Sequence, residues 1–387
     1  MRIIIAPDKF KGSLSAREAA QAISRGLSGG WPEAELTSCP LADGGEGTLE
    51  VLVHATGGKT VACDVTGPLG EARRAPLGIL GDGKTAVVEM AAASGLVLVP
   101  PGKRDPRYTT TLGTGDLIRA ALDMGMRRII VGIGGSATND GGSGMASALG
   151  VRFLDDYGDD LSPGAIYLNN LETLDMGGLD PRILQTRIVV ASDVNNPLLG
   201  EEGASHVYAT QKGASEYDVE LLESGLTRLS EAVSAALVPG LEKKPGAGAA
   251  GGLGFGLMAF LGAEIRPGVD VVMEAAGFER KLTTCDLAIT GEGRLDAQTA
   301  YGKTVSGVAR VASRLGIPVL ALAGEVAEGA EKLHELGVTA MLGIAHGPMS
   351  LEESIASAPL LLLDTSRELA SLLSRYSAQW DTMQNGI

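Results

Sequence analysis

The chain has 387 residues, including 55 glycines, and a formal net charge of -15. The length suits about two domains of roughly 100–200 residues each, and the negative charge argues against nucleic acid or an anionic membrane surface as the main partner. The three cysteines are too few and too widely spaced for a disulfide framework or a zinc site, and no apolar run approaches the ~18 residues that a membrane helix needs. These features predict a soluble, cytoplasmic protein.

The first residues predict a strand, a loop and a helix. The apolar run at residues 2–6 is typical of a buried strand, and Ser15 with Glu18 forms the capping-box pattern that begins a helix. This order indicates an α/β architecture. Lys9 and Lys11 lie in the intervening loop, where open parallel sheets bind ligands. They are either solvated or in contact with an anion, and we expect at least one contact because the chain as a whole is acidic.

A second strand and helix are predicted at residues 35–41 and 49–55, separated by an acidic glycine loop. Asp43 and Glu46 in that loop are suited to a metal ion or to substrate hydroxyls. Asp43 is equally suited to capping the helix that follows. Both interpretations of this loop stay open.

Residues 78–85 match the phosphate-loop pattern G-x-x-x-x-G-K-[ST]. That pattern binds phosphate only where a strand precedes the loop and a helix follows it. Here residues 86–90 are typical of a strand, and residues 81–83 have hairpin-turn chemistry. We therefore predict a β-hairpin at this position, not a nucleotide loop.

The central segment, residues 128–148, combines a β-branched strand, a glycine-rich loop and the start of a helix. Such a loop leaves backbone N–H groups free near a helix N-terminus, where an anion binds favourably. Hydroxyl and amide side chains add hydrogen bonds, and Asp140 is able to hold a metal ion or accept a proton. The alternative is a tight connection whose Ser and Thr only cap the helix. The loop residues expected to bind are Gly134, Gly135, Ser136, Thr138, Asn139 and Asp140.

Two further loops carry polar or glycine-rich sequence. Asp193 and Asn195 follow a strand predicted at residues 187–191 and are suited to metal-bound phosphate or a polyhydroxyl substrate. Residues 246–251 contain the dinucleotide pattern G-x-G-x-x-G, but residues 241–245 are polar where that motif needs an apolar strand. A glycine-lined helix entry that admits a nucleotide and a flexible hinge both stay open for this segment.

The last polar loop follows a strand predicted at residues 285–290. Two more strands are predicted at residues 318–323 and 339–344, each with a helix as its partner. The alternation of strands and helices predicts parallel sheets. The polar residues of the loop are Glu292, Arg294, Asp296 and Gln298.

Six motifs, in order along nearly the whole chain, resemble the type 1 glycerate kinase family. They are APDKFKGSLS at residues 6–15, ADGGEGT at 42–48, GGSATNDGG at 134–142, DVNNPL at 193–198, PGAGAAGG at 245–252 and TGEGRLDAQ at 290–298. Lys9 departs from the resemblance, since Ser is expected there, and Thr210 stands where Pro is expected.

The resemblance implies an ATP-dependent kinase that phosphorylates D-glycerate, usually to 2-phosphoglycerate, with Mg²⁺. It also implies two α/β domains with the active site in the cleft between them. One is a flavodoxin-like parallel-sheet domain, expected from residues 1–66 and 283–387. The other is an inserted α/β domain, expected from residues 67–282.

On this interpretation Asp193 or Asp296 is the base that orients the attacking hydroxyl or a Mg²⁺ ligand, and the two roles stay open between them. Lys11 and Arg294 are expected to contact the glycerate carboxylate or the transferring phosphate. The substrate-binding candidates are Lys9, Asp43, Glu46, Ser136, Thr138, Asn139, Asp140, Asn195 and Gln298. The nucleotide-binding candidates are Gly134, Gly135, Gly246, Gly248, Gly251, Gly291 and Glu292.

Two other functions would use similar loops. A sensor built from two α/β domains would bind a small acid without turnover, and a dehydrogenase is suggested only by the pattern at residues 246–251. Phosphorylation at the 3-hydroxyl is a further alternative within the kinase interpretation. The sequence leaves the oligomeric state open, a homodimer included.

Overall fold

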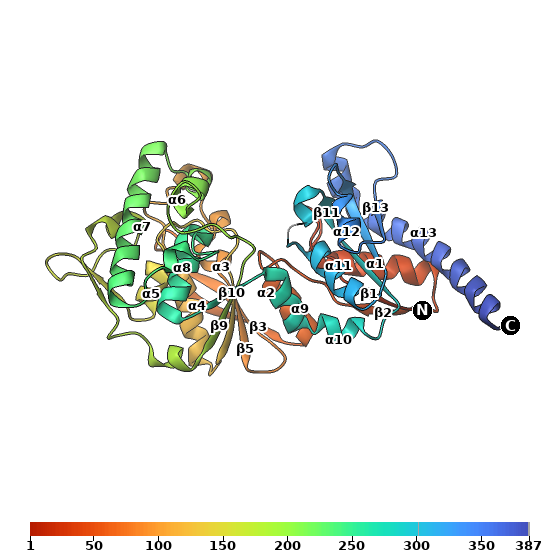
Figure 1. The fold of residues 1–387 in the computed structure, drawn as a ribbon, viewed down its shortest axis with the longest axis horizontal. Coiled ribbons are helices and arrows are strands. Elements are labelled where there is room, and N and C mark those ends of the chain that lie inside the picture. The colour runs from red at the N-terminus through yellow and green to blue at the C-terminus, as the bar shows by residue number, and fades with distance from the viewer. Residues whose placement is uncertain (301, 386–387) are drawn as a thin grey trace. The chain divides into compact units, whose positions relative to one another are not determined.

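The computed structural model describes residues 1–300 and 302–385. The chain forms two compact units: unit 1 consists of Met1–Asp43 and Val272–Ile387, and unit 2 of Gly44–Val271. Figure 1 shows that each unit has its own sheet with helices packed against it. The predicted α/β fold class is therefore confirmed.

The units divide the chain at different residues from those expected. The sequence suggested divisions after residues 66 and 282, whereas the contacts divide the chain after Asp43 and Val271. The first boundary lies before residue 66 because of strand pairing. Strand β3 (Lys59–Thr66) pairs along its whole length with β4 (Ala72–Ile79) and therefore belongs to unit 2. An alternating strand does not reveal from its own sequence which sheet it joins.

Unit 1 is built on a five-stranded, wholly parallel sheet in the order β2-β1-β11-β12-β13. Counted along unit 1 alone, this is the order 2-1-3-4-5 of flavodoxin-like folds, as predicted. Its core includes Ile3, Ile5 and Ile289, all fully buried. The strands are β1 (Arg2–Ile5), β2 (Glu35–Ser38), β11 (Leu287–Leu295), β12 (Val319–Val326) and β13 (Ala340–Gly343).

Capping fixes the start of α1 in unit 1, and a glycine allows its close packing on α13. Helix α1 begins at the predicted capping box, in which Ser15 and Glu18 each accept a hydrogen bond from the other's backbone N–H. Gly26 lets α1 approach α13 closely, because an added Cβ there would lie 2.3 Å from the Leu363 carbonyl oxygen. The helices are α1 (Ala16–Gly30), α10 (Phe278–Leu282), the 3-10 helix η7 (Ala297–Ala300), α11 (Thr304–Arg314), α12 (Lys332–Glu335) and α13 (Leu351–Asn385).

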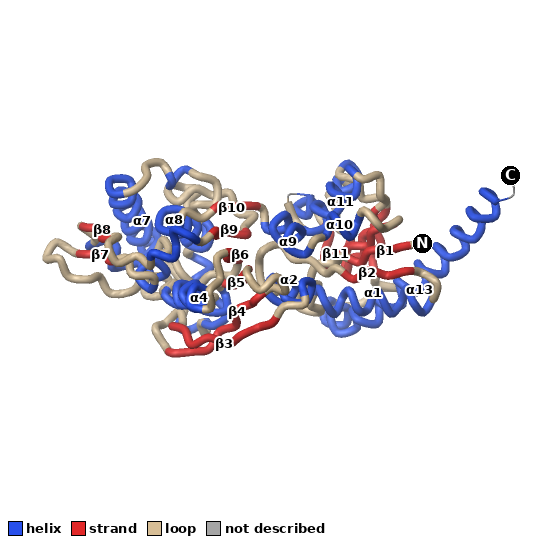
Figure 2. The backbone as a smooth tube through the Cα atoms, turned by 90° about the horizontal axis from the view of Figure 1, so that it is seen from below, coloured by secondary structure: helices blue, strands red, loops and turns tan. Residues whose placement is uncertain are grey.

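Unit 2 contains a six-stranded mixed sheet in the order β10-β9-β6-β5-β4-β3, which Figure 2 shows as a row of red strands. The strands from β10 to β5 are parallel, and β4 and β3 are antiparallel additions. The predicted hairpin is confirmed, since Asp82 in its turn accepts hydrogen bonds from the backbone N–H groups of Lys84 and Thr85. The remaining strands are β5 (Thr85–Glu89), β6 (Arg128–Gly132), β9 (Arg187–Ala191) and β10 (Glu264–Arg266), with a small antiparallel pair, β7 (Arg152–Leu154) and β8 (Thr173–Asp175).

The large core of unit 2 lies between its sheet and its helices, and the apolar residues of β5 and β6 are central to it. The helix α9 (Gly268–Ala276) begins in unit 2 and runs across the division into unit 1. The other α-helices are α2 (Thr48–Thr56), α3 (Ala91–Ser94), α4 (Leu112–Asp123), α5 (Ser143–Ala148), α6 (Ala204–Tyr208), α7 (Glu216–Ala236) and α8 (Ala249–Leu261). The 3-10 helices are η1 (Leu96–Leu98), η2 (Pro101–Lys103), η3 (Ala165–Asn170), η4 (Pro181–Gln185), η5 (Thr210–Lys212) and η6 (Leu241–Lys243).

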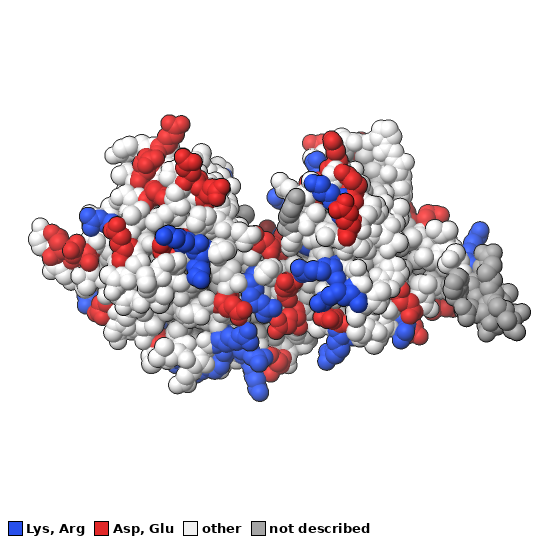
Figure 3. All heavy atoms as spheres, in the orientation of Figure 1, with Lys and Arg blue, Asp and Glu red and all other residues white. Residues whose placement is uncertain are grey.

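Within the described residues, no helix combines the length and the apolar character that crossing a bilayer requires. On the face shown in Figure 3, basic side chains occur in small groups among acidic ones in both units. On this face, positive charge for an anionic ligand would come from individual side chains and from backbone N–H groups.

Candidate functional site

Three acidic residues of unit 1 form a group at the carboxyl ends of its strands. Asp8 follows β1, Asp43 follows β2, and Glu292 belongs to the last part of β11. A backbone hydrogen bond joins Asp8 to β11, because the N–H of Asp8 donates to the Gly291 carbonyl at 2.8 Å. Strands β1 and β11 are the neighbours at which a 2-1-3-4-5 sheet reverses its order, and open α/β sheets bind ligands at that point.

The environment of Asp8 and Glu292 raises the pKa of both carboxyls. Burial, followed by the negative charge of Asp43, raises the pKa of Asp8 to about 6. Burial also raises the pKa of Glu292 to about 7, and the charges of Asp8 and Asp43 contribute. Asp8 is only 4% exposed, whereas Glu292 is partly exposed. Glu292 is therefore the carboxyl of the two that a ligand reaches more easily.

Threonine hydroxyls and a helix N-terminus hold these carboxyls in place. Thr304, the first residue of α11, donates its hydroxyl hydrogen bond to Asp8, and the Thr299 hydroxyl donates to Glu292 at 2.8 Å. Lys303 is the N-cap of α11, and its charge opposes the rise in the pKa of Glu292. The positive end of an eleven-residue helix thus adjoins the acidic group.

The predicted catalytic residues Asp296 and Arg294 both have partners within the protein. Asp296 accepts hydrogen bonds from the backbone N–H groups of Gln298, at 2.8 Å, and Thr299, at 3.3 Å. Arg294 lies 3.7 Å from Asp296 and 3.5 Å from Glu325. Asp296 therefore caps η7, which is a structural role that its position in the sequence did not distinguish from a chemical one.

The other predicted residues of unit 1, Lys9, Lys11 and Gly291, differ in their surroundings. Lys9 lies beside the acidic group, since its charge opposes the rise in the pKa of Asp8, while Lys11 is exposed. Gly291 is buried within β11, where an added Cβ would lie 2.1 Å from the Leu322 carbonyl oxygen. Close strand packing accounts for the glycine at this position, and its contact with a nucleotide stays a prediction.

In unit 2, three of the predicted loops meet at the carboxyl edge of the parallel strands. An added Cβ on Gly44 would lie 3.0 Å from the Cβ of Ala191, and one on Gly134 would lie 3.1 Å from the Cα of Gly45. Gly134 and Gly135 are exposed after β6, as are Asp193 and Asn195 after β9, and Glu46 is exposed in the loop after Asp43. Asp193 also accepts a hydrogen bond from Gly268 N–H at 2.9 Å. This edge presents exposed backbone and polar side chains together.

The rest of the central loop turns inward. Thr138, Asn139 and Asp140 are fully buried, and Ser136 is 9% exposed. Asp140 accepts hydrogen bonds at 2.8 Å from both the N–H and the hydroxyl of Thr111, and longer ones from Gly142 and Gly144 N–H. These three side chains are therefore held within the protein, and the expectation that they contact substrate stays a prediction. They fold the loop, and only its first glycines are accessible.

Lys212, which sequence analysis did not select, is the cation at the centre of this buried network. Its side chain is 2% exposed, and its Nζ donates to the Thr138 carbonyl at 2.7 Å. Burial lowers the pKa of Lys212 to about 7, and the charge of Asp140 opposes that change. The Thr138 hydroxyl and the Asn139 side-chain oxygen are buried without a hydrogen-bond partner among the described residues. A lysine at the end of the short 3-10 helix η5 has no sequence signal for such burial.

The glycines of the dinucleotide-like pattern are buried against protein backbone. A Cβ added to Gly248 would lie 2.2 Å from the carbonyl oxygen of Pro197. A Cβ added to Gly251 would lie 1.9 Å from the carbonyl oxygen of Thr138. Gly246 packs against Ile265. Close packing explains why these positions are glycine, and their predicted role in approaching a nucleotide stays untested.

Comparisons with known proteins agree with this architecture. A sequence model of the glycerate kinase family matches residues 3–374. The chain belongs to the glycerate kinase family. Members of this family are kinases, which transfer phosphoryl groups, so the predicted enzyme class is confirmed.

Similar proteins extend over nearly the full length of this family member. A glycerate kinase of Bacillus subtilis is 48% identical over 96% of this chain and 97% of its own length. A glycerate 2-kinase of Escherichia coli is 48% identical over 97% of this chain and 98% of its own length. The crystal structure of a Salmonella typhimurium LT2 protein described as glycerate kinase 2 superposes with a TM-score of 0.89, at 46% identity, covering 98% of this chain and 99% of that one.

Proposed function

We propose that this kinase transfers the γ-phosphoryl group of ATP to the 2-hydroxyl of D-glycerate, giving 2-phosphoglycerate and ADP. The similarity to a protein named glycerate 2-kinase supports the substrate and the position. The observation that carries the chemistry is the acidic group of unit 1, in which Asp8 and Glu292 lie at the strand-order reversal with raised pKa values.

Glu292 is our candidate for the group that accepts the proton of the attacking hydroxyl. A general base works best when its pKa lies near the operating pH, and the pKa of Glu292 is raised to about 7. Its hydrogen bond from Thr299 fixes the position of one carboxyl oxygen while the side chain stays partly exposed. Asp296, in contrast, is engaged in capping η7 and is the weaker candidate.

The acidic group also suits Mg²⁺. No three acidic, histidine or cysteine side chains in the described parts of the chain form a ready-made metal cage. Mg²⁺ usually takes one or two carboxylates together with waters and substrate phosphates, so Asp8 with Asp43 matches its needs. The repulsion among these carboxyls is the kind that a divalent cation relieves. When bound, Mg²⁺ would neutralise charge on the transferring phosphoryl group.

Positive groups beside the carboxyls are suited to the phosphates. Lys303 and the N-terminus of α11 supply a side-chain cation and backbone N–H groups close to Glu292. In unit 2, the exposed Gly134 and Gly135 offer backbone to a ligand, and Asp193 and Asn195 offer polar side chains. We assign this second edge to the polar groups of glycerate or ATP, as the sequence motifs suggested.

The test is a coupled ADP-release assay with ATP, Mg²⁺ and D-glycerate, followed by phosphorus NMR of the product. The proposal predicts turnover and a resonance that matches authentic 2-phosphoglycerate. A 3-phosphoglycerate resonance would overturn the assigned position, and glycerate binding without ADP release would indicate a sensor. Removal of the metal with EDTA is expected to abolish turnover, and added Mg²⁺ to restore it.

A further inference from the structure

Lys212 is a buried cation to which the function proposed above gives no task. It is the last residue of the 3-10 helix η5, and its Nζ donates to the Thr138 carbonyl of the central loop at 2.7 Å. Lysine is almost never fully buried without a partner. We propose that Lys212 is a positioning residue for phosphoryl transfer, which holds the central loop so that Gly134 and Gly135 present their backbone to a substrate. This inference rests on the proposed function.

The Thr138 carbonyl depends on Lys212 for its hydrogen bond. Thr138 is fully buried, and among the described residues no other group donates to its carbonyl oxygen. Gly251 packs against the same oxygen, since an added Cβ there would lie 1.9 Å from it. A buried acceptor that loses its donor is destabilising. Without the ammonium, the loop would therefore shift to find another donor.

The backbone that carries Lys212 is itself fixed. The N–H of Lys212 donates to the Ala209 carbonyl at 2.9 Å. Gly213 follows in the left-handed conformation, with a φ of 107°, and an added Cβ there would lie 2.3 Å from the Arg104 carbonyl oxygen. Glycine at this position therefore lets η5 pack closely on the segment that contains Arg104. The ammonium starts from a fixed point and is able to hold the loop in place.

The hydrogen bond alone does not explain why the donor is a lysine. The neighbouring Ala137 carbonyl accepts a hydrogen bond at 2.8 Å from the neutral hydroxyl of Thr109. Burying an ammonium costs more than burying a hydroxyl. The Thr138 hydroxyl and the Asn139 side-chain oxygen also lack a partner among the described residues. This network is not arranged for stability alone, which is a feature of functional sites.

A short paired segment joins the held carbonyl to the exposed glycines. The N–H of Leu96 donates to the Gly135 carbonyl at 2.8 Å, and the N–H of Ala137 donates to the Ser94 carbonyl at 3.0 Å. Close-packed interiors transmit displacements of this kind. A shift at Thr138 would therefore change the position of Gly135, which is exposed at the carboxyl edge of the sheet in unit 2.

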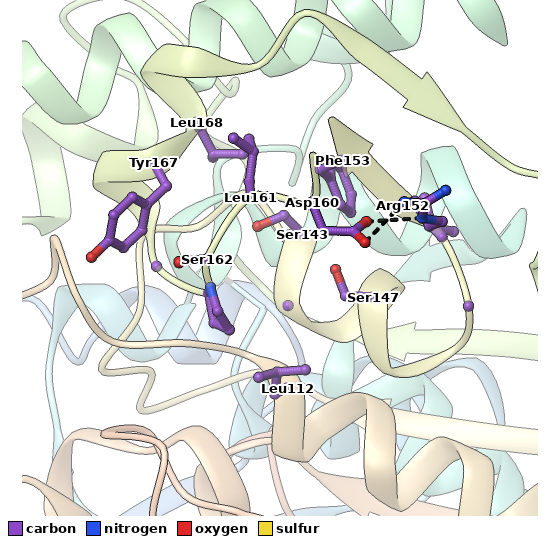
Figure 4. Close-up of a pocket in the computed structure, with 15 residues that line it drawn as sticks. Leu112, Ser143, Ser147, Arg152, Phe153, Asp160, Leu161, Ser162, Tyr167 and Leu168 are labelled. Carbon is purple, nitrogen blue, oxygen red and sulfur yellow. Dashed lines mark hydrogen bonds and ion pairs between the residues drawn. The ribbon is translucent and has the colours of Figure 1, made fainter. Parts of the chain in front are cut away.

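The surface hollow beside α5 does not account for Lys212. Figure 4 shows Ser143 and Ser147 of α5 bordering this hollow. Neither Lys212 nor Thr138 belongs to its lining. The buried cation therefore acts through the loop that it holds, and not on a ligand in that hollow.

The experiment compares the steady-state kinetics of Lys212→Ala and wild type with ATP, Mg²⁺ and D-glycerate. The KM for at least one substrate should rise about tenfold or more, and kcat should change by less than about threefold, because the loop contributes binding. Leu77→Ala, at a fully buried position of β4 in the same core, is the control for lost stability and should keep both parameters. Circular dichroism verifies that both variants are folded.

Chemical rescue separates the ammonium from the volume of the side chain. n-Propylammonium replaces the part of the side chain that Lys212→Ala removes, and it should lower the raised KM. Propionitrile has a similar size and no N–H group, and it should leave the KM raised. Wild type is measured with both additives so that effects of the solvent are subtracted.

Unchanged KM values for both substrates in Lys212→Ala would overturn the proposal, whatever happens to kcat. An equal rise in Leu77→Ala, or equal rescue by propionitrile, would also overturn it, because only a packing role would then be left. If Lys212→Ala does not fold, Lys212→Met is measured in its place with the same KM criterion. Wild-type turnover tests the proposed function, whereas the difference between variants tests Lys212, so the two failures are distinguishable.

Discussion

Replacing Glu292 with Gln should make the metal-free protein more stable at alkaline pH. The folded-state pKa of Glu292 is raised from 4.5 to about 7, so the folded state binds the proton more tightly than the unfolded state does. The stability associated with this proton is fully present below about pH 4.5 and is lost as pH rises through about 7. At about 1.4 kcal/mol per pH unit, the ionised carboxyl costs the fold about 3 kcal/mol at pH 8. Gln keeps an oxygen that accepts the Thr299 hydrogen bond and carries no charge.

The assay is thermal unfolding in EDTA at pH 5 and pH 8, followed by tryptophan fluorescence. Trp31 is buried in the core of unit 1, so its signal reports the unit that contains Glu292. We expect the Tm difference between Glu292→Gln and wild type to grow by roughly 5–10 °C between the two pH values, because about 2.5 kcal/mol of the cost develops over this interval and each kcal/mol shifts Tm by about 2–4 °C. Glu331→Gln, an exposed glutamate of unit 1, is the control. A Tm difference that is equal at both pH values would refute the reasoning.

Three further substitutions test the assignments of structural roles. Asp296→Asn should lower kcat, measured by ADP release, by less than about tenfold, because Asn accepts the same capping hydrogen bonds. A loss of about a thousandfold in kcat would restore Asp296 as a catalytic candidate. Lys212→Met should destabilise unit 2 by about 3 kcal/mol relative to the exposed control Lys84→Met, because it leaves Asp140 buried without its cation. Equal midpoints of urea unfolding for the two variants would contradict this prediction. Gly251→Ala should cost more than about 3 kcal/mol, since its Cβ would lie 1.9 Å from the Thr138 oxygen, whereas Gly83→Ala, at a similar positive φ with open space, should cost about 1–2 kcal/mol. Similar unfolding energies for the two glycine variants would show that close packing at Gly251 is unimportant.

Local sequence rules succeeded where the determining contacts are local. The capping box of Ser15 and Glu18 begins α1, and the turn at residues 81–83 forms a hairpin despite its phosphate-loop pattern. The flavodoxin-like order of unit 1 came from the family resemblance, since spacing alone does not order strands in a sheet. Each of these features rests on neighbours in sequence or on a motif long enough to be specific.

Burial and long-range contacts give several residues surroundings that sequence reasoning did not foresee. Asp140 has the composition of a ligand-binding residue, but it is buried because Thr111, from a preceding segment, supplies its donors. Asp8 was not selected, although it follows the first strand, because its partner Thr304 lies almost three hundred residues away in the chain. The loop position of Asp8 at a parallel strand's carboxyl end was the one available signal. Asp296 and Glu292 share a loop, and only the fold separates the capping residue from the member of the acidic group.

The most direct test of the proposed chemistry is the turnover number of Glu292→Gln with ATP, Mg²⁺ and D-glycerate at pH 8. Loss of a general base typically lowers the rate by about 10²–10⁴-fold. We predict a fall in kcat within that range, with Glu331→Gln unchanged. A kcat within about threefold of wild type would contradict the assignment of Glu292 and, with it, the central role of the acidic group.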